Sequence, residues 1–158
     1  MICYVYKKFE YKFFGYKLFM LFRECLCFNL GKAARKLSRV TGEKVSKFGI
    51  TTTQFFLLIA LYEEEGITIT NLAQKVALDK ATLTGLLDRL ERDSLIERRP
   101  DCRDRRVIRI HLKEKALRIK EEIQGLYNEI NSRFLSIFSE EEKEIFESII
   151  SKIDNAEF

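Results

Sequence analysis

Proline and glycine are scarce in this sequence, which has one proline and seven glycines in 158 residues. That composition excludes collagen-like and linker-rich chains and favours helix. The length fits one domain, or one compact domain with helical extensions. Hydrophobic residues, at 46%, are sufficient for a core, and the 33% of charged residues indicate a soluble protein.

The residue types that enzymes and metal sites need are also few. His111 is the only histidine, and the four cysteines, Cys3, Cys25, Cys27 and Cys102, are irregularly spaced. Zinc sites need clustered thiols and imidazoles, and the sequence lacks a phosphate-binding G-x-x-x-x-G-K-[ST] loop and any nucleophile–base motif. We therefore expect no enzymatic activity, no metal and no cofactor. Irregular cysteines without a secretory signal indicate a reduced, cytoplasmic protein.

Long apolar runs are absent from the N-terminal extension, residues 1–22. Its first nineteen residues are rich in aromatic side chains but are interrupted by four lysines and a glutamate. A membrane-spanning helix needs about 20 mostly apolar residues, so this segment does not qualify. It is either an amphipathic segment on a membrane surface or a stretch upstream of a natural start at Met20. We favour the second interpretation and expect no membrane partner.

Charge is distributed unevenly along a chain whose net charge is only +4. Between Arg98 and Lys113 there are seven basic residues and two acidic ones, whereas from Glu121 to the end there are ten acidic and three basic residues. A basic middle followed by an acidic tail predicts one face for a polyanion and another for a different contact.

The spacing of apolar residues predicts a mainly α fold with a helix-turn-helix. An amphipathic helix is expected over residues 23–40. A second, largely hydrophobic helix begins at the N-cap Thr51, with Gln54 as its capping-box partner. After a very short strand, two short helices capped by Thr70 and Asp79 follow. Joined by a tight turn, they have the helix-turn-helix pattern.

A basic β-hairpin follows directly. Strands are expected over residues 96–99 and 106–112, joined by the turn PDCRD. In the second strand every other residue is apolar, which is the period of a half-buried ribbon. A helix-turn-helix followed by such a hairpin is a winged helix, here residues 51–113.

The helices at the two ends are predicted to form a dimerisation layer. Residues 23–50 supply one helix and its connection, and residues 114–158 supply two more. The first of these is expected as one helix over residues 115–138, and the last begins at a capping box of Ser139 and Glu142. Its apolar face has no remaining core to cover, and consists of Ile145, Phe146, Ile149, Ile150 and Ile153.

The helix at residues 80–94 has the features of a DNA recognition helix. Four leucines are expected to face inward, namely Leu83, Leu86, Leu87 and Leu90. The candidate DNA contacts are Lys80, Thr82, Thr84, Gly85 and Arg89. Short hydroxyl side chains and a glycine near a helix N-terminus let the backbone approach a groove, where the hydroxyls bond base edges or phosphate. An ordinary surface helix has a similar pattern, so the hairpin that follows is what favours DNA.

The hairpin supplies the stronger signal. Arg103, Arg105 and Arg106 crowd a turn with few apolar residues, so they extend into solvent, where an arginine fits the narrow minor groove. Asp104 is expected to brace an adjacent arginine through a charge-assisted hydrogen bond. A merely solvated hairpin is the alternative, but surface charge normally mixes the two signs more evenly.

The segments LDKATLTGLLDRLERDSLIERR and DRRVIRIHL resemble the recognition helix and the D-x-R wing motif of the MarR family of bacterial and archaeal regulators. The resemblance covers residues 25–153. It implies a homodimer with interlocked terminal helices that binds a pseudo-palindrome in double-stranded DNA. It also implies small, often aromatic anionic effectors bound between the dimer layer and the winged helix.

By the same resemblance, Thr82, Thr84 and Arg89 meet the major groove and Arg106 the minor groove. The chain departs from the family beyond the wing. In the family's L-T-x-x-G segment, Lys113 replaces the threonine and Ala116 replaces the glycine.

A narrower resemblance concerns the organic-hydroperoxide-sensing branch of the family, whose reactive cysteine matches Cys27. Oxidation there rearranges the dimer off DNA, and nearby tyrosines hydrogen-bond the thiolate. Gly31 and Thr41 stand in the places of those tyrosines. A thiol without a stabilising donor reacts slowly, and free cysteine is often a packing residue. Both roles, redox sensing and packing, therefore stay open for Cys27.

These observations predict a sequence-specific DNA-binding transcriptional regulator, with repression favoured by family analogy and release by a small ligand or by thiol oxidation. The second interpretation is a winged-helix module that contacts other proteins without binding DNA specifically. Acidic residues in the wing would favour that module, whereas arginines favour DNA. Salt separates the two, because neutralising phosphates makes affinity fall steeply with ionic strength.

Overall fold

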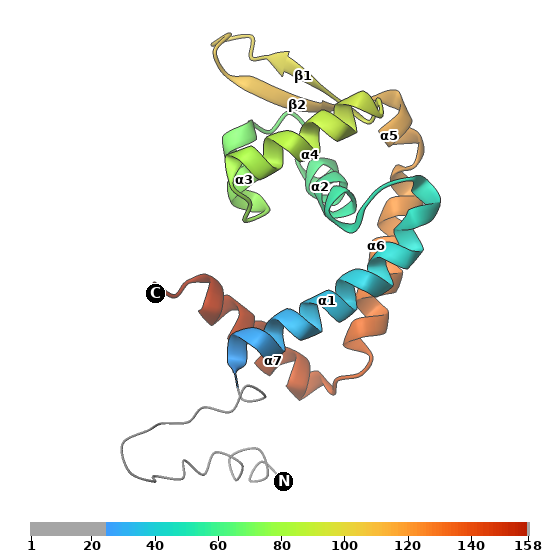
Figure 1. Ribbon diagram of the computed structural model, residues 1–158, viewed down its shortest axis with the longest axis vertical. Coiled ribbons are helices and arrows are strands. Elements are labelled where there is room, and N and C mark those ends of the chain that lie inside the picture. Colours follow the sequence, from blue (N-terminus) through green and yellow to red (C-terminus); the bar gives the residue numbers. More distant parts are fainter. Residues whose placement is uncertain (1–24, 158) are drawn as a thin grey trace. The chain divides into compact units, whose positions relative to one another are not determined.

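A computed structural model describes residues 25–157 (Figure 1). The chain divides into two compact units, residues 1–39 and 40–158, and the expected extension, residues 1–22, lies outside the described part. The elements are α1 (Leu26–Val45), the 3₁₀ helix η4 (Ser46–Phe48), α2 (Thr52–Glu63), α3 (Ile69–Lys75), α4 (Lys80–Arg92), β1 (Ile96–Pro100), β2 (Ile108–Leu112), α5 (Glu114–Arg118), α6 (Lys120–Leu135) and α7 (Glu140–Asp154). The predicted mainly α fold with one short hairpin is confirmed.

In the first unit, the described residues are 25–39 and belong almost entirely to α1. This part of the helix has an exposed apolar row and an exposed basic row. The apolar row is Leu26, Leu30 and Leu37, and the basic row is Lys32, Arg35, Lys36 and Arg39. The Arg35 guanidinium carbon lies 6.0 Å from the centre of the Phe28 ring.

The second unit begins within α1, which continues to Val45 and not to residue 40 as predicted. Gly42 suggested an earlier end, but Thr41 and Val45 are buried in the core of this unit, and packing outweighs the low helix propensity of one glycine. The chain turns instead at Gly49, whose φ of 69° is readily adopted only by glycine.

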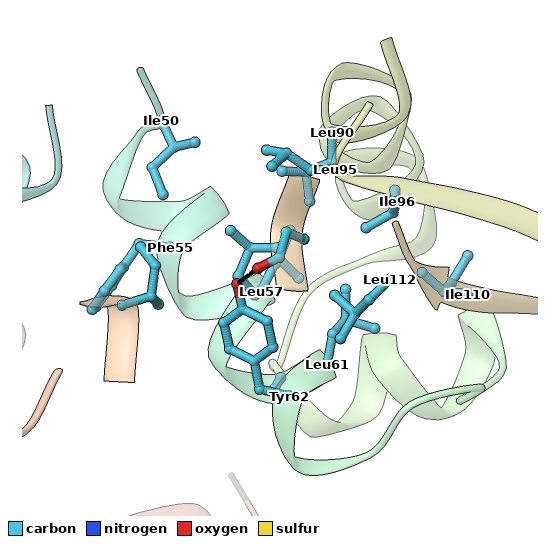
Figure 2. Packing of buried hydrophobic residues seen from close by; sticks show 14 of the residues in the cluster. Ile50, Phe55, Leu57, Leu61, Tyr62, Leu90, Leu95, Ile96, Ile110 and Leu112 are labelled. Atoms are coloured by element: carbon cyan, nitrogen blue, oxygen red, sulfur yellow. Dashed lines mark hydrogen bonds between the residues drawn. The ribbon is translucent and has the colours of Figure 1, made fainter. Parts of the chain in front are cut away.

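The core of the second unit is built around α2. The predicted capping box is present: the Thr51 side chain accepts from the Gln54 amide, and the Gln54 side chain accepts from the Thr51 amide at 2.9 Å. Side chains from α4, β1 and β2 pack over this helix (Figure 2). The fully buried large members of the cluster are Val45, Phe55, Leu57, Leu58, Leu61, Leu72, Leu83, Leu87, Leu90, Ile96, Ile110 and Ile123.

The helix-turn-helix is formed by α3 and α4, with one correction to the prediction. Thr68, and not Thr70, is the N-cap of α3, because its hydroxyl oxygen accepts from the Asn71 amide at 3.2 Å. The expected strand before α3 reduces to a single bridge between Thr68 and Arg109. Two backbone hydrogen bonds to β2 hold this segment extended up to the cap: the Gly66 N–H donates to the Ile110 carbonyl, and the Ile110 N–H donates to the Ile67 carbonyl, both at 3.0 Å.

The hairpin pairs β1 with β2 in an antiparallel register that places Ile96 opposite Leu112 and Arg98 opposite Ile110. Ile96, Ile110 and Leu112 are buried against the helices, as the predicted alternation requires. From this anchored end the paired strands lead to the turn at residues 101–107, the wing (Figure 1).

The helix expected over residues 115–138 is interrupted at Ile119, where α5 ends and α6 begins. Ala116 is completely buried, and its carbonyl accepts the Tyr62 hydroxyl at 2.7 Å (Figure 2). Burial raises the pKa of Tyr62 to about 12. Beyond the break at Ile119, α6 buries Ile123, Leu126 and Ile130.

The last helix, α7, starts at the predicted capping box of Ser139 and Glu142. None of its residues is buried in the described chain. Its apolar face, predicted as a buried one, is exposed, and consists of Ile145, Phe146, Ile149, Ile150 and Ile153.

Within residues 25–157 no single helix is long and apolar enough to cross a membrane. One bent pair of helices, Leu26–Phe48 with Thr52–Glu63, has the length and composition of a span.

Candidate nucleic-acid interface

The N-terminus of α4 is organised by the predicted cap, Asp79. Its carboxylate accepts the backbone N–H of Thr82 at 2.9 Å and the Thr82 hydroxyl at 2.6 Å. These hydrogen bonds, the one from the hydroxyl above all, lower the pKa of Asp79. Because the hydroxyl proton is committed to Asp79, the exposed Thr82 oxygen faces an incoming partner as an acceptor.

One turn further, Thr84 and Gly85 form an exposed surface on α4. The Thr84 hydroxyl donates to the Lys80 carbonyl at 2.7 Å, so this oxygen too is left as an acceptor. Acceptors in the major groove suit the amino groups of adenine and cytosine. A Cβ at Gly85 would meet no atom within 4 Å. Packing within the chain therefore does not require glycine there, and its small size matters only to something that approaches α4 from outside.

Two cations flank this surface. Lys80, at the start of α4, and Arg89, near its end, are both exposed. Neither forms a salt bridge with any residue in the part of the chain that the structure describes. Their charges are thus available to phosphates, the groups that dominate affinity for nucleic acid.

The wing turn is held together by Asp101, a residue that sequence reasoning placed only in a turn. Its carboxylate accepts the backbone N–H groups of Arg103 (2.7 Å) and Asp104 (3.3 Å), and it pairs with the Arg109 guanidinium. Arg109 in turn donates to the Gly66 carbonyl at 2.7 Å. The Arg109 hydrogen bond and then the two backbone donors lower the pKa of Asp101 to about 2. Aspartate at the start of a turn was the available signal.

Asp104 braces an arginine of the turn, as predicted, but the arginine is Arg106, two residues further on, and not an immediate neighbour. Its two oxygens accept from Nε and Nη2 of Arg106, each at 3.1 Å, and the Arg106 backbone N–H donates to the same carboxylate at 3.0 Å. These contacts lower the pKa of Asp104. The Arg106 side chain is nevertheless 91% exposed, so the carboxylate fixes its direction without covering it.

Arg103 and Arg105 are exposed beside Arg106, and neither has a salt-bridge partner among residues 25–157. The structure thus brings together the predicted wing residues Arg103, Asp104, Arg105 and Arg106 in one turn, and the predicted helix residues Lys80, Thr82, Thr84, Gly85 and Arg89 on α4. Their roles toward DNA stay predictions.

Arg98 links the hairpin to α4, and sequence reasoning did not single it out. It lies on β1 opposite the buried Ile110, and its guanidinium contacts Asp88 and Glu91 of α4. A charged residue at an inward position of the strand alternation was the signal that pointed to it.

One cysteine, Cys102, lies in the wing turn. Cys27 and Cys102 are exposed free thiols, Cys25 is half-buried, and Cys3 lies outside the described residues. Redox sensing and packing both stay predictions for Cys27. Over residues 25–157, histidine, cysteine, aspartate and glutamate side chains form no cluster suited to a metal ion.

Comparison with known proteins connects this arrangement to one family. Residues 50–108 match the MarR family model. The chain is 31% identical over 135 residues to the HTH-type transcriptional regulator MgrA of Staphylococcus aureus, covering 85% of this chain and 90% of that protein. It is 34% identical over 131 residues to the uncharacterized HTH-type transcriptional regulator YsmB of Bacillus subtilis, covering 80% and 90%.

Solved structures give the same result. The S. aureus MepR–DNA complex superimposes with a TM-score of 0.76 at 26% identity, covering 82% of this chain and 96% of that one. A mutant MarR from E. coli complexed with operator DNA superimposes with a TM-score of 0.75 at 25% identity, covering 85% and 98%.

Proposed function

The chain belongs to the MarR family of transcriptional regulators, and on this basis we propose that it is a repressor that binds a pseudo-palindromic operator as a homodimer. It is a DNA-binding regulator and not an enzyme. The observation that carries the proposal is the set of exposed cations on α4 and the wing that have no carboxylate partner in the described chain.

In the proposed complex, α4 enters the major groove. Lys80 and Arg89 contact phosphates or the guanine edge, and the acceptor oxygens of Thr82 and Thr84 face base amino groups. Gly85 allows the close approach. The structures of MepR in complex with DNA and of a mutant MarR in complex with operator DNA support DNA binding by a chain that superimposes on both.

In the same proposed complex, the wing lies along the DNA backbone and enters the minor groove. Arg106, held by Asp104, is the residue presented for insertion, and Arg103 and Arg105 neutralise phosphates beside it. An arginine fixed before binding loses less side-chain entropy when it enters the groove.

The homodimer is supported by apolar side chains that a single chain leaves uncovered. α7 exposes five large apolar residues, and the described part of the first unit exposes three leucines. Two copies would present two recognition helices to half-sites about 34 Å apart, one turn of B-DNA. The regulator would act in the cytoplasm, where its operator is accessible.

The proposal is tested by titrating the full chain with the DNA upstream of its own gene at several salt concentrations. We expect affinity to fall steeply as salt rises, and Arg106→Ala to weaken binding at least about tenfold. Arg118→Ala is the matched control, since Arg118 is an exposed arginine paired with a carboxylate, Glu114, outside the interface. Binding that ignores salt, or equal losses in the two variants, would favour the protein-contact module.

Release from DNA is proposed to follow binding of a small anionic, often aromatic effector, or oxidation of Cys27. The exposure of the Cys27 thiol supports the second route, because peroxides can reach it. An organic hydroperoxide should then dissociate the wild-type complex but not the Cys27→Ser complex, with Cys102→Ser as the control thiol. If the wild-type complex persists in peroxide, oxidation of Cys27 is excluded as the release mechanism and binding of an effector is the route that remains.

A further inference from the structure

Arg98 occupies an unusual place on the hairpin. The register sets it opposite Ile110, which is completely buried, so Arg98 belongs to the face of the ribbon that packs on the helices. Its side chain is only 22% exposed. The next residue, Arg99, points the other way, is 59% exposed and forms an ion pair with Glu97 of its own strand.

The hydrogen bonds and ion pairs of the Arg98 guanidinium lead to the recognition helix α4. Its Nη1 lies 2.6 Å from Glu91 Oε2 and 2.8 Å from Asp88 Oδ1, and its Nη2 donates to the Thr84 carbonyl at 3.3 Å. Its backbone N–H donates to the other oxygen of Glu91 at 3.0 Å. Thr84, Asp88 and Glu91 are four and three residues apart, so they share one face of the helix.

We infer that Arg98 is a positioning residue for DNA binding, which clamps the wing hairpin to the recognition helix so that both meet DNA as one unit. The inference rests on the proposed function, since it concerns how the α4 and wing contacts cooperate. One guanidinium reaches the helix at three successive turns, including the carbonyl of Thr84, whose side chain faces the major groove in the proposed complex. A planar fork with five donors can make these contacts together, and an ammonium cannot.

The clamp also controls charge at the interface. Asp88 and Glu91 are carboxylates on the helix that approaches a polyanion, where free carboxylates would repel phosphate. Arg98 holds both against the hairpin. Its own charge is thereby engaged inside the protein, so it acts on DNA through α4 and not by a phosphate contact.

Arg98→Lys tests this directly, because it keeps the positive charge and removes the fork. We expect roughly tenfold weaker operator binding, with the slope of affinity against salt unchanged, since no phosphate contact is lost. Arg99→Lys, the neighbouring exposed arginine on the same strand, should bind like the wild type. If Arg98 instead contacted a phosphate, Arg98→Lys would preserve affinity, because lysine binds phosphate as a point charge.

Glu91→Gln is a second test, because the clamp and an explanation from net charge alone predict opposite changes in affinity. Removing an acidic charge near DNA should strengthen binding if only net charge matters. The clamp predicts about threefold weaker binding, because Arg98 loses its closest partner. Without DNA, amide hydrogen exchange in β1, β2 and α4 should accelerate in both variants while that of α2 stays unchanged.

The outcomes separate the two proposals. If the wild type binds its operator and Arg98→Lys binds equally well, or loses about one unit of salt slope, the clamp is overturned and the proposed function stands. Tighter binding by Glu91→Gln also overturns the clamp. If the wild type binds no DNA at any salt concentration, the proposed function fails and this inference fails with it.

Discussion

At the scale of single residues, the wing depends on carboxylates that never need to touch DNA. Asp101 ties two backbone amides of the turn to Arg109, and Arg109 reaches the loop before α3 through Gly66. Asp104 then sets the direction of Arg106. Arg106 can therefore stay exposed and still be held in one direction.

The titration of Asp101 is a direct prediction. Its pKa is about 2 in the folded chain, against about 3.9 for an unperturbed aspartate. A carboxyl with a lowered folded pKa stabilises the fold fully above the unfolded value, and this contribution is lost as the pH falls from about 4 through 2. Carboxyl-detected NMR should give an apparent pKa near 2, and an ordinary value near 4 would show that the turn is not held in this way.

The sequence allowed a pairing of Asp104 with a neighbouring arginine to be predicted, because opposite charges lie close together in the Asp104-Arg105-Arg106 motif. The role of Asp101 could not be predicted in the same way. Its partner Arg109 lies eight residues away, and their contact depends on the hairpin register. Local chemistry is readable from sequence, whereas contacts fixed by pairing require the fold.

At the scale of elements, α4 ends in a tight turn with an unusual residue. Ser94 has a φ of 61°, in the left-handed region. Its N–H donates to the Glu91 carbonyl and that of Leu95 to the Leu90 carbonyl, both at 2.9 Å. This is the Schellman pattern that usually has glycine at the position of Ser94. The turn leads directly into β1, so it sets where the hairpin starts.

Ser94→Gly should stabilise the chain, because glycine adopts this conformation without the Cβ penalty. We expect the free energy of unfolding in urea to rise by about 0.5–1 kcal/mol, with an unchanged m-value. Ala81→Gly, in the first turn of the same helix, is the control and should lower stability by a similar amount. Equal losses in the two variants would contradict the strained turn.

Element types were predictable from periodicity, but several boundaries were not. α1 runs past Gly42 because Thr41 and Val45 are buried. The long helix predicted near the C-terminus breaks at Ile119, where the segment around the buried Ala116 docks against Tyr62. Each boundary was decided by tertiary packing, which propensity does not describe.

At the scale of the whole molecule, the apolar face of α7 is the main apolar surface that the described chain leaves exposed. A large contiguous apolar surface on a regulator marks an interaction site. The apolar spacing of this helix was readable from the sequence and, with the family resemblance, predicted a dimerisation layer. The second copy that would cover this face stays a proposal.

Ile149→Glu should separate the proposed dimer, because it places a charge in the middle of the apolar face of α7. Sedimentation should show a dimer for the wild type and mainly monomer for the variant. Operator affinity should fall with it, since the two half-sites are no longer bound together. Ser148→Glu, on the polar side of α7, should remain dimeric, and a monomeric wild type would refute the arrangement.

The central claim is sequence-specific recognition of DNA by α4 and the wing. It is tested most directly by selecting bound duplexes from a random pool with the full wild-type chain at physiological salt. The account predicts an enriched inverted repeat with half-site centres about one helical turn apart, lost from pools selected with Arg106→Ala. A wild-type pool without an enriched sequence, or one enriched in single unpaired sites, would contradict it.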